Sequence, residues 1–159
     1  MQKENIMNTR QKKLTLTKWV KYLMDFMFFS GIAVTLSLPF SLKLIGHYYP
    51  TLSDHYKEAV VIYFVLGIAA VVVIGELRKI FRTVLNEDCF VMENVVSLRK
   101  MGNLSFFIVL MSVVRSIVYT TVAMLVVILV FVIAGLFCKV LALVFEEAVH
   151  YKEENDLTI

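Results

Sequence analysis

One apolar segment, residues 59–75, limits what this chain can fold into more than any other feature of its sequence. The segment reads AVVIYFVLGIAAVVVIG and contains no charged residue. A helix of about 20 apolar residues crosses the roughly 30 Å hydrocarbon core of a bilayer. The whole chain agrees with this interpretation, because 59% of its residues are hydrophobic and its mean hydropathy is +0.77. We therefore expect an integral membrane protein.

Further apolar segments predict three more spans. The region 104–145 is too long for one crossing at about 1.5 Å per residue, so it must fold back on itself. We place the tight turn at RSIVYTT, residues 115–121, because this is the polar cluster of the region. A backbone in lipid must satisfy its own hydrogen bonds, so the spans are expected to be helices. The four expected spans are residues 20–42, 59–77, 103–118 and 122–145.

The distribution of basic residues predicts the orientation of these spans. Lysines and arginines are concentrated in residues 1–19 and 78–102, whereas the first loop contains only Lys43 and Lys57. Loops on the cytosolic side of a membrane are enriched in basic residues. Both termini and the central segment are therefore expected in the cytosol.

The central segment 78–102 has a pattern of its own. Apolar residues recur at helical spacing over 77–85 opposite basic ones, which predicts that the second span continues as a helix. A turn at Glu87 and Asp88 then precedes a second amphipathic helix that leads into the third span. The basic faces suit anionic lipid headgroups, whereas the acidic turn would be repelled by them and must face another partner. The predicted fold class is all-α, a membrane four-helix bundle with a cytosolic helical hairpin between spans two and three.

The sequence carries no signature of an enzyme. It lacks the HExxH, GxSxG and CxxC motifs, a P-loop and a Rossmann glycine pattern. The expected topology separates His47 and His55 from His150, and a zinc site needs about four convergent donors. We therefore expect no catalytic residue, no metal and no cofactor. Cys89 and Cys138 lie near the cytosolic side, where thiols stay reduced, so no disulfide is expected.

Ionisable residues within the spans are candidates for function, because burying a charge in hydrocarbon is costly unless it is paired. Asp25 in the first span and Lys139 in the fourth lie at similar depth and have opposite charge. One hypothesis is that they form an intramembrane pair, and the other is that Lys139 reaches the headgroups while Asp25 is solvated. Arg115 belongs at the outer end of the third span, where its side chain can reach the interface.

The second half of the chain resembles a known family. The stretch ELRKIFRTVLNEDCFVMENVVSLRKMGNLSF, a hydrophobic hairpin and the ending EENDLTI are similar to the YoaS-like family of bacterial four-span membrane proteins of unknown function. The matching positions are Leu77, Phe81, Leu85, Phe90, Asn94, Leu98, Arg99, Gly102, Glu154, Asp156, Leu157, Thr158 and Ile159. The resemblance implies a bacterial cell membrane and no established activity. It also implies a neighbouring gene for a small Cro/C1-type helix-turn-helix protein, which suggests that the chain serves a regulator.

The acidic tail, residues 146–159, fits such a partner. An acidic tail is usually solvated and repelled by the anionic leaflet, but that does not account for its apolar tip. Carboxylates would attract a basic DNA-binding protein, and the tip would fill a small pocket on it. We do not expect direct binding of nucleic acid by the chain itself. The predicted partner-binding residues are Glu87, Asp88, Phe90, Glu153, Glu154, Asp156, Leu157 and Ile159.

The sequence leads us to expect a single membrane domain, residues 1–159, without enzymatic activity, that sequesters or signals to such a regulator. A first alternative is a small-molecule transporter or a peptide or toxin immunity protein. A second alternative is a structural membrane module that assembles as a homo-oligomer through small residues on its helices.

Overall fold

Four long helices form most of the protein in the computed structural model, which describes residues 2–46, 56–85, 89–118 and 121–156. They are α1 (Gln2–Gly46), α3 (Tyr56–Leu85), α4 (Met92–Val118) and α5 (Val122–Asp156). Each contains a stretch that is long and apolar enough to cross a membrane. The prediction of an all-α chain with four such helices is therefore confirmed, and the protein is a multi-pass membrane protein.

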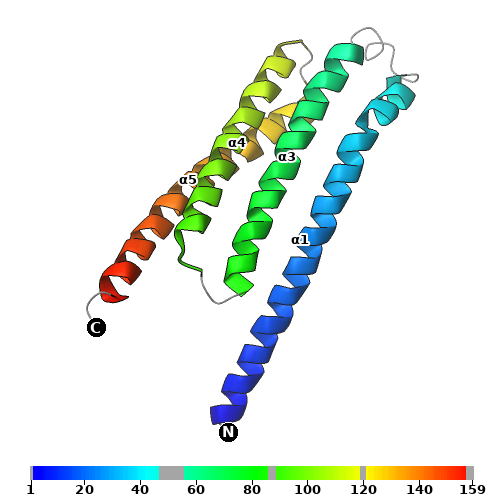
Figure 1. The fold of residues 1–159 in the computed structure, drawn as a ribbon. Coiled ribbons are helices and arrows are strands. Elements are labelled where there is room, and N and C mark those ends of the chain that lie inside the picture. The colour runs from blue at the N-terminus through cyan, green and yellow to red at the C-terminus, as the bar shows by residue number, and fades with distance from the viewer. Residues whose placement is uncertain (1, 47–55, 86–88, 119–120, 157–159) are drawn as a thin grey trace.

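The helices pack in a row that follows their order in the chain (Figure 1). α1 packs on α3, α3 on α4, and α4 on α5, and within the described residues α1 does not contact α5. The row is therefore open, with α1 and α5 at its edges. The described ends of the chain, Gln2 and Asp156, lie at the same end of the row as the α3–α4 connection. We call this end the base of the row.

The helices extend beyond the expected spans. α3 continues past residue 77 to Leu85, and α4 begins at Met92 rather than at residue 103. The segment expected as a hairpin, 78–102, is thus the continuation of two spans, and its place in the cytosol stays a prediction. α4 ends at Val118, so the turn to α5 falls at the end of the expected 115–121 cluster.

The best-packed core lies at the base, where α3, α4 and α5 meet. Its buried members are Val95, Leu98, Ala142 and Val149, and Ile80, Leu141 and Phe145 pack against them. Large apolar side chains along the rest of all four helices are exposed on outward faces, where lipid tails would cover them. Since lipid is as apolar as leucine, packing and polar contacts between helices must hold the row together.

Glycines let the helices of the row approach closely. A Cβ atom on Gly67 of α3 would lie 2.9 Å from the side chain of Thr35 on α1. A Cβ atom on Gly102 of α4 would lie 3.3 Å from the carbonyl oxygen of Gly135 on α5. Small residues at helix contacts allow this close packing, in which backbones lie against each other. The contacts fix the register of α1 on α3 and of α4 on α5.

Candidate functional site

Glu76 is a charged residue buried between α3 and α4. Its residue exposure is 7%, and its carboxylate accepts hydrogen bonds from Lys79 Nζ and Ser97 Oγ, each at 2.9 Å. The Nζ atom of Lys100, also on α4, lies 3.9 Å from the same carboxylate. A carboxylate in an apolar environment is costly unless it is paired and hydrogen-bonded. These donors compensate its charge, and the contacts join α3 to α4.

A second charged contact joins α1 to α3. Asp25 on α1 forms an ion pair with Arg78 on α3. The Cζ atom of Arg78 also lies 5.4 Å from the ring centroid of Phe28 and 5.9 Å from that of Phe29. A guanidinium within about 6 Å of a ring face is attracted by the ring quadrupole. Arg78 is therefore held by one carboxylate and two aromatic rings of the neighbouring helix.

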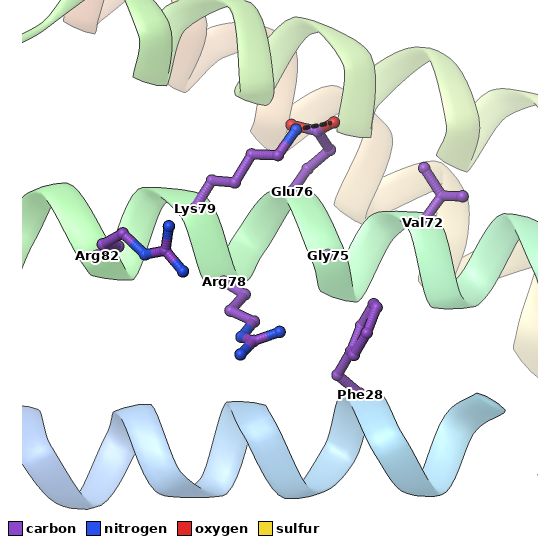
Figure 2. A pocket seen from close by; sticks show the side chains of 7 residues that line it. All are labelled: Phe28, Val72, Gly75, Glu76, Arg78, Lys79 and Arg82. Atoms are coloured by element: carbon purple, nitrogen blue, oxygen red, sulfur yellow. Dashed lines mark hydrogen bonds and ion pairs between the residues drawn. The ribbon is translucent and has the colours of Figure 1, made fainter. Parts of the chain in front are cut away.

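These two contacts border an open groove of about 320 Å³ on the α1 side of α3 (Figure 2). Arg78 and Phe28 extend into the space between α3 and α1, whereas Glu76 and Lys79 point toward α4 (Figure 2). The lining is basic toward the base of the row and apolar farther from it. The lining residues are Phe28, Val72, Gly75, Glu76, Arg78, Lys79 and Arg82.

A buried asparagine ties together the base of α3 and α4. Asn94 is 1% exposed; its Oδ1 accepts a hydrogen bond from Thr83 Oγ1 at 2.8 Å, and its Nδ2 donates one to the carbonyl of Cys89 at 2.7 Å. The backbone N–H of Asn94 donates to the carbonyl of Val91 at 3.0 Å. A single side chain thus links the last turn of α3, the connection and the first turn of α4.

The base of α5 is fixed to α4 by an ion pair and an aromatic contact. Arg99 Nη2 donates to the Glu146 carboxylate at 2.6 Å. The rings of Phe90 and Phe145 lie 5.5 Å apart between centroids. Phe90, which the sequence suggested as a partner-binding residue, is nevertheless 46% exposed. It packs against α5 with one face and stays accessible with the other.

The hypothesis of a pair between Asp25 and Lys139 does not hold in the structure. Asp25 pairs with Arg78, whereas Lys139 Nζ donates to Asn103 Oδ1 at 2.6 Å. The physical reason is the open row, in which α1 and α5 are separated by two helices. The two residues have opposite charge, but the two helices are not neighbours.

Arg115 lies near the end of α4 that is opposite the base. Its residue exposure is 7%, and its guanidinium Cζ lies 5.2 Å from the ring centroid of Tyr63 on α3. The sequence suggested a side chain that reaches out to the interface. The structure instead packs the guanidinium between helices, against an aromatic face that can stabilise its charge.

The acidic tail begins as part of α5. The helix continues to Asp156, and Glu153 and Glu154 are exposed in its last turns. The other residues predicted to bind a partner, Glu87, Asp88, Leu157 and Ile159, lie outside the described residues. The structure therefore places Phe90 and the two glutamates at the base, without bringing them into contact with the Asp25 or Lys139 sites.

Sequence analysis missed Glu76 and the groove beside it. Glu76 follows the apolar run 59–75 directly, and the sequence pattern assigned it no role. A signal was nevertheless present: Lys79 follows at a spacing of three, which places its ammonium beside the carboxylate on one helix face. The contributions of Ser97 and Lys100 had no such signal, because they depend on the register between α3 and α4.

One of three comparisons with known proteins found a match. A family model described as "Protein of unknown function (DUF2975)" matches residues 7–159. No curated protein and no solved structure matches the chain. The family match includes the groove, the polar contacts at the base and the acidic end of α5. The chain therefore belongs to this family of proteins of unknown function.

Proposed function

We propose that this protein is a non-enzymatic membrane protein that binds a helix-turn-helix transcriptional regulator at the cytosolic side and thereby keeps it from DNA. The observation that carries the proposal is the course of α5. Its last buried core residue is Val149, yet the helix continues to Asp156. At about 1.5 Å per residue, this extends the helix about 10 Å beyond the core.

The exposed end of α5 has the charge that a DNA-binding protein would recognise. Glu153 and Glu154 lie on a helix and not on a flexible segment, so less conformational entropy is lost when a partner binds. A helix-turn-helix protein carries a basic face for phosphate, and complementary charge increases the rate of encounter. The exposed face of Phe90 offers an apolar contact at the same end of the row.

Occupation of the basic face by α5 would compete with DNA for the regulator. The protein would then act by sequestration, with the four helices as the anchor and the end of α5 as the docking segment. The similarity of the sequence to the YoaS-like family supports a regulator as the partner, since members of that family are encoded beside one.

The experiment is a crosslinked pull-down from native membranes that compares the full chain with a chain lacking residues 153–159. A charge-reversed variant, Glu153→Lys with Glu154→Lys, tests the carboxylates within an intact tail. Glu147→Lys is the matched control, because Glu147 is exposed on the same helix but lies before the docking segment. Captured proteins are identified by mass spectrometry, and duplex DNA is then added to the captured complex.

The proposal predicts that the full chain and the Glu147→Lys control capture a small basic DNA-binding protein, which added DNA releases. The truncated and charge-reversed chains should lose it. Identical captures by all four chains, or a captured regulator that DNA does not release, would contradict docking through α5. Transport, immunity or a structural role would then become the leading proposals.

A further inference from the structure

We infer that the groove between α1 and α3 is a binding site for one anionic phospholipid from the leaflet at the base of the row. The phosphate would lie against Arg78 and Arg82, and one acyl chain would follow Phe28 and Val72. This inference does not depend on the proposed regulator, because it concerns a different face of the molecule. It assigns a ligand to the groove that Glu76, Arg78 and their neighbours form.

The charges of the groove favour an anion. Of its three cationic side chains, Arg78 pairs with Asp25 and Lys79 pairs with Glu76. Arg82 is exposed, and no carboxylate within the described part of the chain pairs with it. Three cations against two carboxylates leave one positive charge, located at the basic end of the groove. An anionic headgroup would complete the pairing.

The register between the two helices brings a further cation to this end. Asp25 lies opposite Arg78, and Phe28 lies opposite Gly75, so α1 and α3 run antiparallel in a fixed register. Continuing this register by one turn places Lys21 of α1 level with Arg82 of α3. Lys21 is exposed. Cations from both helices therefore flank the position that we assign to the phosphate.

The apolar end of the groove distinguishes a lipid from a small soluble anion. Phe28, Val72 and Gly75 line it, and the Phe28 ring packs directly over Gly75. From Val72 to Arg82 the groove follows ten residues of helix, or about 15 Å. That length accommodates a headgroup phosphate and the upper part of an acyl chain. A free phosphate would occupy the basic end and leave the apolar wall uncovered.

The open row gives a lipid direct access to this groove. Both helices that border it contain predicted membrane spans, and α1 is at the edge of the row, with a neighbour on one side. Basic residues near a membrane surface attract anionic lipids with about 1 kcal/mol per residue, which corresponds to about fivefold in affinity. The groove adds shape selectivity to this electrostatic attraction, because the acyl chain and the phosphate of one lipid must fit it at the same time.

The test uses the full-length protein, purified and delipidated in a neutral detergent, and native mass spectrometry to measure lipid binding. Dioleoylphosphatidylglycerol is the anionic probe and dioleoylphosphatidylcholine is the zwitterionic probe. Arg82→Gln removes the groove cation with which no carboxylate of the described residues pairs. Its matched control is Arg99→Gln, which removes the same charge at the base but outside the groove. Val72→Trp fills the apolar end and leaves every charge in place.

We expect phosphatidylglycerol to bind at least about fivefold more tightly than phosphatidylcholine, and Arg82→Gln to remove most of this preference. The Arg99→Gln control should keep it, and Val72→Trp should weaken both lipids. Equal binding of the two lipids, or an equal loss from Arg82→Gln and Arg99→Gln, would overturn the site. Displacement of phosphatidylglycerol by excess inorganic phosphate would overturn the lipid assignment in favour of a free anion.

Discussion

Ser97 on α4 donates a hydrogen bond of 2.9 Å to the carboxylate of Glu76 on α3. Both residues are buried, so the contact fixes two helices to each other at a point where neither side chain reaches bulk solvent. Glu76 also lines the groove toward α1. Glu76 thus belongs both to the contact of α3 with α4 and to the wall of the groove, while its carboxylate points toward α4.

Replacing Ser97 by alanine should destabilise the packing of α3 on α4. The substitution removes a hydrogen bond to a buried carboxylate, and we expect the free energy of unfolding to fall by about 1 to 2 kcal/mol. Unfolding by sodium dodecyl sulfate in mixed micelles, followed by circular dichroism, measures this change. Ser37→Ala is the control, because the Ser37 hydroxyl bonds to the Val34 carbonyl of its own helix. Equal effects of both substitutions would contradict a special role of the interhelical bond.

Charge exchange between Asp25 and Arg78 should preserve their ion pair. Asp25→Arg and Arg78→Asp alone each place like charges at the α1–α3 contact, so each should lower the unfolding midpoint. The double variant should recover most of this loss, with a coupling free energy of about 1 kcal/mol. The exchange of Asp25 with Lys139 should show no recovery, because α1 and α5 do not touch in the described part of the row. Recovery in the second pair and none in the first would contradict the open row.

Gly67→Ala should strain the contact between α1 and α3. The new Cβ atom would lie 2.9 Å from Thr35, and overpacking of this kind costs about 1 to 3 kcal/mol. Thr35→Ala removes the atoms in conflict and should restore stability in the double variant. Gly31→Ala serves as the control, because its Cβ atom would meet Val71 at 3.4 Å, an ordinary contact. A stable Gly67→Ala protein would show that the two helices are not in close contact there.

Asn94→Ala should loosen the connection between α3 and α4. Without the Asn94 side chain, the Thr83 hydroxyl keeps only the Ile80 carbonyl of its own helix as an acceptor and the Cys89 carbonyl loses its donor, at a cost of about 1 to 3 kcal/mol. The Cys89 thiol should then react faster with a maleimide in mild detergent. The buried Cys138, which is distant in sequence from this connection, provides the internal reference. An unchanged ratio of the two labelling rates would mean that Asn94 does not hold the connection.

The sequence predicted which segments are helices better than it predicted which helices pack against each other. Length and hydropathy are local quantities, so the four apolar runs were sufficient to predict four long apolar helices. The end of α3 at Leu85 likewise coincides with a break in the helical pattern of the sequence. The pairing of charged residues depends instead on which helices touch and in what register.

The charged residues illustrate this difference. Asp25 and Lys139 have suitable depth and charge, but depth does not identify the neighbour, and the next helix in the chain supplied Arg78. Helices that follow each other in sequence are usually adjacent in space, and this rule would have favoured Arg78. Arg115 was expected at the interface because its position is terminal in the span. The face of Tyr63 that covers it depends on a register that no local pattern encodes.

The proposed function requires that the acidic end of α5 faces the cytosol, where a regulator can bind to it. Asn155→Cys in a chain with Cys89→Ser and Cys138→Ser provides one thiol at this end, and Ser53→Cys in the same background provides one in the first loop. An impermeant maleimide is applied to intact cells and to opened cells. We expect position 155 to react only in opened cells, whereas position 53 should also react in intact ones. Labelling of position 155 in intact cells would place the tail outside and contradict the proposed function.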